Sequence, residues 1–184
     1  RRRAQPPRTR FHPPRRQVVR MPQPTPASPS APPPRDVAGV VAPPPLIYVL
    51  GLLLGAVLDR GWPLPLLPAT VSTPLAVLCG LAGLLVIPAI RAFRRAGTRP
   101  EPWKPTTALV TDGPFRFSRN PMYLGFSLIY LAVALSIGSG WTLALFPVVL
   151  LVMHHGVIQR EERYLERRYG EAYRDYRRRV RRWL

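Results

Sequence analysis

Residues 120–159 read NPMYLGFSLIYLAVALSIGSGWTLALFPVVLLVMHHGVIQ and contain no Asp, Glu, Lys or Arg. As a single helix, an uncharged run of this length would extend about 60 Å, roughly twice the hydrocarbon thickness of a bilayer. The Gly-Ser-Gly sequence at residues 138–140, near its midpoint, is typical of a tight turn. We therefore expect two antiparallel membrane spans that form a hairpin, at about 121–137 and 141–158.

Two further apolar runs precede this hairpin. The run at about 72–92 is long enough to cross a bilayer, whereas the run at 46–58 has only 13 residues. The first span becomes long enough if residues 37–42 continue it through a proline kink, or if residues 61–67 lie in the interface. Two glycines four residues apart in this run would let another helix approach closely. The pattern predicts an all-α, polytopic membrane protein with about four transmembrane helices.

The charged residues are segregated from these apolar runs. The chain has 27 Lys and Arg against 9 Asp and Glu. The connection between the first two spans and the turn of the hairpin lie on one face of the membrane, and Arg60 is their one basic residue. By the positive-inside rule, both termini are expected to be cytosolic. We expect an integral protein of a bacterial cytoplasmic membrane whose arginines contact anionic headgroups. Nucleic-acid binding is disfavoured, because no aromatic-interleaved basic domain or finger spacing appears.

The two ends of the chain differ in composition. Residues 1–45 contain 14 prolines and nine basic residues, which predicts a disordered or polyproline-like cytosolic tail, with a partner-binding role as the alternative. No cleavable signal peptide is expected, since the first apolar run begins after more than forty residues. The fourth helix is predicted to continue to Gly170. Beyond it, helical spacing predicts an amphipathic helix on anionic headgroups, with an apolar face formed by Tyr173, Tyr176, Val180 and Trp183.

A polar, turn-rich segment at residues 109–123, LVTDGPFRFSRNPMY, links the second span to the hairpin. Asn120 followed by Pro121 predicts a helix start, because Asn caps free N–H groups and Pro is favoured at the first helical position. A helix N-terminus favours an anion such as a carboxylate. The alternative is a membrane-entry turn whose arginines lie at the lipid headgroups.

Two acids, Glu161 and Glu162, lie where the fourth helix is expected to leave the bilayer. The hairpin brings this exit to the same membrane face as Asn120. Carboxylates beside a helix N-terminus suit a ligand that carries both an amine and a carboxylate. The alternative is a solvated helix face on which the acids pair with nearby arginines. His154, inside the span on the face of Glu161, is either a functional residue or a histidine hydrogen-bonded to the helix backbone.

The sequence offers little for metal or disulfide chemistry. Cys79 is the single cysteine and lies in an apolar run. The three histidines, at positions 12, 154 and 155, do not have the spacing of metal ligands. We therefore expect neither a metal site nor a disulfide.

Two ordered blocks of sequence resemble a known family. The first is LVTxGPFRxxRNPMYLG at residues 109–125, and the second is EERxLxxxYGExYxxY at residues 161–176. Together they resemble the superfamily of isoprenylcysteine carboxyl methyltransferases and phospholipid methyltransferases, over about residues 72–184. The resemblance implies a membrane methyltransferase domain at 46–184. Such a domain binds S-adenosylmethionine at the cytosolic ends of the last spans and methylates a lipid-like or amphipathic acceptor through a lipid-accessible tunnel.

By that resemblance the cofactor pocket is lined by Leu109, Val110, Phe115, Arg119, Asn120, Pro121, Tyr123, Glu161 and Glu162. Asn120 stands where the family usually has His, and Asn cannot take a proton. A carboxylate acceptor is already ionised, whereas an amine acceptor needs a base, for which Glu162 and His154 are the catalytic candidates. The Asn therefore favours a carboxylate, thiolate or similar acceptor. The alternatives are a phospholipid or small-thiol methyltransferase, and a non-catalytic membrane protein that binds anionic lipid.

Overall fold

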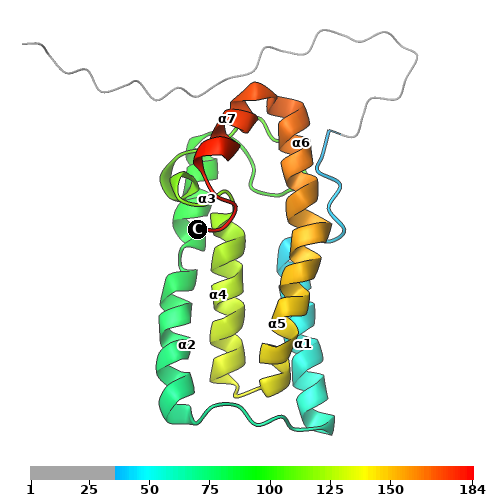
Figure 1. The fold of residues 1–184 in the computed structure, drawn as a ribbon, viewed down its shortest axis with the longest axis vertical. Helices are drawn as coiled ribbons and strands as arrows, with labels where there is room; N and C mark the ends of the chain where they lie inside the picture. Colours follow the sequence, from blue (N-terminus) through cyan, green and yellow to red (C-terminus); the bar gives the residue numbers. More distant parts are fainter. Residues whose placement is uncertain (1–35) are drawn as a thin grey trace, which may run out of the picture.

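The computed structural model describes residues 36–184, and the expectations for the tail at residues 1–35 lie outside this part. Within it, long helices stand side by side as rods, with shorter elements gathered at one end (Figure 1). In chain order the elements are α1 (Pro44–Gly61), α2 (Ala69–Gly83), α3 (Val86–Arg95), η1 (Gly113–Arg116), α4 (Pro121–Ser136), α5 (Gly140–Met153), η2 (His154–Ile158), α6 (Gln159–Tyr169) and α7 (Glu171–Arg179). The first of the two η elements is a 3-10 helix and the second is a π-helical turn.

The predicted membrane spans are present as apolar helices. Three helical stretches are long and apolar enough to cross a bilayer, namely Pro44–Gly61, Ala69–Arg95 and Gly140–Tyr169, and α4 is a shorter apolar helix. The first span is longer than predicted because Pro43 takes the cap position and the helix begins at the next proline, where a missing N–H costs nothing. The chain is therefore an all-α, polytopic membrane protein, as predicted.

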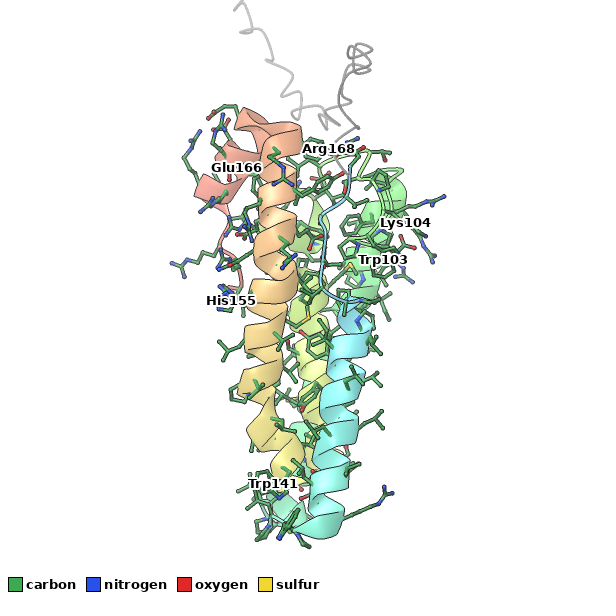
Figure 2. All side chains as sticks on the ribbon, turned by 90° about the vertical axis from the view of Figure 1, so that its right-hand side faces the viewer. Trp103, Lys104, Trp141, His155, Glu166 and Arg168 are labelled. Atoms are coloured by element: carbon green, nitrogen blue, oxygen red, sulfur yellow. The ribbon has the colours of Figure 1, made fainter. Side chains whose placement is uncertain are left out.

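Charged and aromatic side chains mark the two ends of these helices. Figure 2 shows nitrogen-tipped side chains gathered at the end that carries Glu166 and Arg168. Along the shafts, large apolar side chains such as Leu78 are exposed, as lipid contact requires. Trp141 lies at the far end and Trp103 lies toward the charged end (Figure 2), and tryptophan is enriched at both membrane interfaces. The apolar shafts between these two levels are the part suited to the bilayer.

Glycines allow α1 and α5 to approach closely. A Cβ atom at Gly55 would clash with Thr142 of α5, and a Cβ atom at Gly51 would lie 2.5 Å from the Val149 side chain of the same helix. These are the two glycines that lie four residues apart in the first apolar run. Their spacing predicted a close helix contact, and the contact is confirmed.

The end of the bundle remote from α7 is held by polar contacts. Ser139 caps α5 by accepting a 3.0 Å hydrogen bond from the N–H of Thr142, and its hydroxyl donates to Asp59 at the end of α1. Trp141 donates from Nε1 to the carbonyl of Trp62 at 2.6 Å. These contacts tie α1 to the turn of the α4–α5 hairpin.

Residues 36–43 lie against η2 and α6. The N–H of Val41 donates to the carbonyl of Gly156 at 3.1 Å. Arg160 donates from Nη1 to the carbonyl of Gly39 at 2.9 Å. The packed part of the chain therefore begins upstream of α1.

The chain turns sharply between α6 and α7. Gly170 ends α6 with a φ of 54°, in the left-handed region that favours glycine, as predicted. α7 then crosses the end of the bundle (Figure 1). Its Tyr173 and Tyr176 are 1% and 4% exposed, because they pack on the protein itself. The predicted C-terminal amphipathic helix is present as α7, but it ends before Val180 and Trp183, and protein rather than lipid headgroups covers its apolar face.

Candidate cofactor site

A cavity lies at the charged end of the bundle, where α3, the loop before α4, the start of α6 and α7 meet. The enclosed part of the cavity has a volume of about 50 Å³, and the space around it that is open to solvent brings the total to about 500 Å³. Its walls are formed by Phe93, Thr106, Ala108, Leu109, Val110, Phe115, Arg119, Asn120, Glu161, Glu162, Leu165, Tyr173 and Tyr176. Asn120 and Glu161 both belong to this set, so the starts of α4 and α6 face one cavity.

Most residues that the resemblance assigned to the cofactor line this cavity. They are Leu109, Val110, Phe115, Arg119, Asn120, Glu161 and Glu162. Pro121 does not line it and is fully buried at the start of α4. Tyr123 also lies outside the wall but donates a 2.8 Å hydrogen bond from its hydroxyl to Oε2 of Glu161. This bond joins the first turn of α4 to the first turn of α6.

Asn120 stands at the cap position of α4, but its side chain makes no capping hydrogen bond. Its Nδ2 instead donates to the carbonyl of Arg182 at 3.0 Å. Its own N–H donates to the hydroxyl of Ser118 at 3.1 Å. The predicted capping role of Asn120 was therefore wrong, because a distant backbone carbonyl competes successfully for the amide.

Glu162 is held by two arginines. Arg119 Nη2 lies 3.1 Å from its Oε1, and Arg182 donates to the same oxygen from Nε at 3.1 Å and to Oε2 from Nη2 at 2.7 Å. Glu162 is 8% exposed, and a buried carboxylate is tolerated only when its charge is compensated. To take a proton from a methyl acceptor, Glu162 would have to release one of these guanidinium groups. Glu162 is therefore poorly placed for the base role that the sequence suggested.

Glu161 has a different environment. Its carboxylate accepts the hydroxyl hydrogen of Tyr123 at Oε2. Within residues 36–184, no Lys or Arg forms an ion pair with Glu161, although the neighbouring Glu162 has two. The cavity therefore presents one buried carboxyl group without a cationic partner among the described residues, and a cationic group of a ligand would stabilise its ionised form.

Arg119 supplies the complementary group. Its side chain is 9% exposed and lines the cavity. In the described part of the chain, its Nε and Nη1 are buried without a hydrogen-bond partner. Buried donors are seldom left unpaired in native structures, and each costs about 1–3 kcal/mol. An anionic or carbonyl oxygen of a ligand would satisfy them.

Aromatic rings complete the wall. Phe93 and Phe115 meet edge to face with ring centroids 5.3 Å apart. Tyr176 donates from its hydroxyl to the carbonyl of Phe115 at 2.7 Å, which ties α7 to η1. Burial raises the pKa of both Tyr173 and Tyr176, and the Glu162 carboxylate raises that of Tyr173 further. Both hydroxyls therefore stay protonated at neutral pH.

The sequence pattern that defines the phospholipid methyltransferase family matches residues 74–172, more than half of the chain. The chain belongs to the phospholipid methyltransferase family. Enzymes of this family use S-adenosylmethionine as methyl donor. The matched range includes every residue of the cavity wall except Tyr173 and Tyr176.

Two known proteins are similar to parts of the chain. An uncharacterized protein of Haemophilus influenzae is 43% identical over 63 residues, which are 34% of this chain and the whole of that protein. The protein-S-isoprenylcysteine O-methyltransferase of Schizosaccharomyces pombe is 36% identical over 72 residues, 39% of this chain. That match covers 30% of the yeast enzyme's length. No solved structure matches the chain.

The charged groups of the cavity match those of the methyl donor that the phospholipid methyltransferase family uses. S-adenosylmethionine carries an ammonium, a sulfonium and a carboxylate. Glu161 can hold a cationic group, and the two unpaired nitrogens of Arg119 can hold a carboxylate. Phe115 and the α7 tyrosines offer rings against which a base can stack.

Several residues of the cavity wall were not predicted from the sequence as site residues. Tyr173 and Tyr176 belong to the second sequence block, and their helical spacing identifies an apolar face without showing whether lipid or protein covers it. The others carried no signal that singles them out from the apolar background, namely Phe93, Thr106, Ala108 and Leu165. His154, by contrast, does not line the cavity. Its Nε2 lies 3.0 Å from Gln159 Nε2 and 3.4 Å from Arg182 Nη1.

Proposed function

We propose that this protein transfers a methyl group from S-adenosylmethionine to a lipid-like or amphipathic acceptor. The observation that carries the proposal is that one cavity holds both an acidic group and a basic group that lack a full set of partners. Glu161 offers a carboxylate with no arginine partner, and Arg119 offers two buried N–H groups without acceptors. A zwitterionic amino acid moiety satisfies both groups at once, and an apolar chain does not.

The residues of the cavity would bind, orient and desolvate the donor. When bound, S-adenosylmethionine supplies an electrophilic methyl group on a sulfonium. Methyl transfer of this kind depends chiefly on alignment and on exclusion of water. Arg119 is fixed by its ion pair with Glu162, and Glu161 by its hydrogen bond from Tyr123. Two charged anchors on different elements hold one ligand in one orientation.

The acceptor that fits best is one that needs no base. Both oxygens of Glu162 are engaged by arginines, and His154 does not line the cavity. A carboxylate or thiolate is nucleophilic without proton removal inside the site, which favours an isoprenylcysteine-like acceptor. An amine-bearing phospholipid is the second candidate, because the chain belongs to the phospholipid methyltransferase family; it would require Glu161 to accept the proton.

We infer that the cavity opens on the cytosolic side. The basic residues of α3, α6 and α7 surround it, whereas the turn regions at the other end contain the single basic residue Arg60. The positive-inside rule assigns the arginine-rich end to the cytosol.

Calorimetric titration of S-adenosylmethionine into the full chain in detergent tests the donor site. We expect binding, and a loss of affinity of roughly tenfold or more in Glu161→Gln, because a charge-assisted contact is removed. Glu166→Gln is the matched control, since Glu166 lies on the same helix, pairs with Arg177 at 3.5 Å and does not line the cavity. Absence of binding by the wild-type chain would instead support a non-catalytic lipid-binding protein.

A second measurement separates the acceptors. The full chain is incubated with S-adenosylmethionine labelled in the methyl group and with vesicles that contain either a prenylated cysteine or phosphatidylethanolamine. Label in a base-labile methyl ester supports the carboxylate acceptor. Label in a headgroup amine supports the phospholipid acceptor, and in that case activity should depend on Glu161 more strongly than donor binding does.

A further inference from the structure

The chain after α7 returns to the start of α4. The N–H of Arg119 donates to the carbonyl of Arg181 at 2.9 Å. The carbonyl of Arg182 accepts two hydrogen bonds, from the Ser118 hydroxyl at 3.2 Å and from Asn120 Nδ2 at 3.0 Å. Residues 181–183, here called the strap, are therefore fastened to the segment that precedes α4.

The side chains of the strap make further contacts. Arg182 spans both oxygens of Glu162 with its Nε and Nη2, and its Nη1 lies 3.4 Å from Nε2 of His154. Trp183 packs against the buried cluster between α1, α4 and α5. The strap thus connects the wall of the cavity to the π-helical turn and to the membrane part of the bundle.

Arg182 and Arg119 share one carboxylate but face different surroundings. Arg119 lines the cavity, whereas Arg182 does not. Glu162 holds Arg119 Nη2 at 3.1 Å, which leaves Nε and Nη1 free for a ligand. If Arg182 were absent, Glu162 would lose two charge-assisted hydrogen bonds and would be free to rotate toward Arg119 and occupy those nitrogens.

We propose that Arg182 is a positioning residue: it fixes Glu162 so that Arg119 presents its unpaired N–H groups to the ligand. The inference rests on the proposed S-adenosylmethionine site but adds a residue outside the 74–172 range that matches the family. It also gives Asn120 a role, because the Asn120 amide holds the backbone of the strap in place. Asn is suited to this role since it donates without titrating.

Arg182→Met tests the proposal, with Arg181→Met as matched control. Both changes remove one arginine from the strap and keep its backbone, but the Arg181 side chain is exposed, and within residues 36–184 only its carbonyl forms a hydrogen bond. The affinity of the full chain for S-adenosylmethionine is measured by calorimetry in detergent. We expect a loss of roughly 10- to 100-fold for Arg182→Met, as for a removed charge-assisted pair, and wild-type affinity for Arg181→Met.

A double-mutant cycle shows whether Arg182 acts through Glu162. In a Glu162→Gln background, Arg182→Met should change the affinity by less than about threefold, because the interaction is already lost. Losses that multiply independently would overturn the proposal, since a generally destabilised protein gives that result. Should Arg182→Met not fold, Arg182→Lys replaces it, because one ammonium cannot match the two-oxygen contact of a guanidinium. Wild-type affinity in that variant also overturns the proposal.

The two proposals can fail separately. If the wild-type chain does not bind S-adenosylmethionine, the proposed function fails. If the wild-type chain binds it and Arg182→Met binds equally well, the donor site stands and only the positioning role of Arg182 is rejected.

Discussion

Glu161 and Glu162 are neighbours in the chain, yet their carboxylates have opposite surroundings. Glu162 is bound by Arg119 and Arg182, whereas Glu161 accepts a hydrogen bond from Tyr123 and has no arginine partner in the described residues. Consecutive helical residues point about 100° apart, so one turns toward the arginines and the other toward α4. The pair therefore divides into an anchor for Arg119 and a carboxylate available to a ligand.

Tyr123→Phe should weaken binding of S-adenosylmethionine by roughly three- to tenfold, because Glu161 loses the hydrogen bond from Tyr123 that orients it. The matched control is Tyr130→Phe. Tyr130 lies on the same helix and donates to the carbonyl of Thr142 at 2.8 Å, away from the cavity. Calorimetry on the purified chain gives both affinities. Equal losses in the two variants would show that Tyr123 acts through general stability.

Arg119→Met should lower the midpoint of thermal unfolding in detergent by roughly 5–10 °C. The change leaves the buried Glu162 with one cationic partner, which costs about 3 kcal/mol. Arg116→Met removes an equal charge from a pair with Asp112 whose side chains are 69% and 60% exposed. Such a surface pair contributes little, so its midpoint should stay near that of the wild type. A similar midpoint for both variants would contradict the buried ion pair.

Gly125→Ala should destabilise the packing of α2 on α4. A Cβ atom there would lie 3.0 Å from the carbonyl oxygen of Gly83, and backbone cannot move aside as a flexible side chain does. We expect a loss of about 1–3 kcal/mol in the free energy of unfolding, measured by denaturant titration. Gly80→Ala is the control, because its Cβ would make only a 3.7 Å contact with Ala132. A smaller loss in Gly125→Ala than in Gly80→Ala would argue against the α2–α4 packing.

Membrane-impermeant maleimide tests the proposed orientation. In a Cys79→Ala background, Gly61→Cys and Arg167→Cys place one thiol at each end of the bundle, both at exposed positions. With the arginine-rich end in the cytosol, intact cells should label Gly61→Cys and leave Arg167→Cys unlabelled until the membrane is permeabilised. The reverse pattern would place the cavity on the other side.

The local character of the chain was readable from its sequence. Segregated charges predicted the apolar helices, Gly170 predicted the end of α6, and the glycine pair predicted close packing of α1. Each of these depends on neighbours within a few residues. The first span begins at Pro44 rather than at residue 46, because Pro43 takes the cap position and Pro44 starts the helix. This difference too is local, because proline is compatible both with a kink and with a helix start.

The tertiary structure decided which partner each polar group found. Asn is a residue type that favours the cap position of a helix. The Asn120 amide instead donates its hydrogen bond to the carbonyl of Arg182, which lies 62 residues away in sequence. The spacing of Tyr173 and Tyr176 identifies an apolar face of a helix. The same spacing is expected whether lipid or protein covers that face. Hydrophobic periodicity records that a side chain avoids water, whereas the path of the backbone determines what replaces the water. The sequence therefore determined the spans and the residue types at their ends, and the return of α7 and the strap onto α4 decided how those residues are paired.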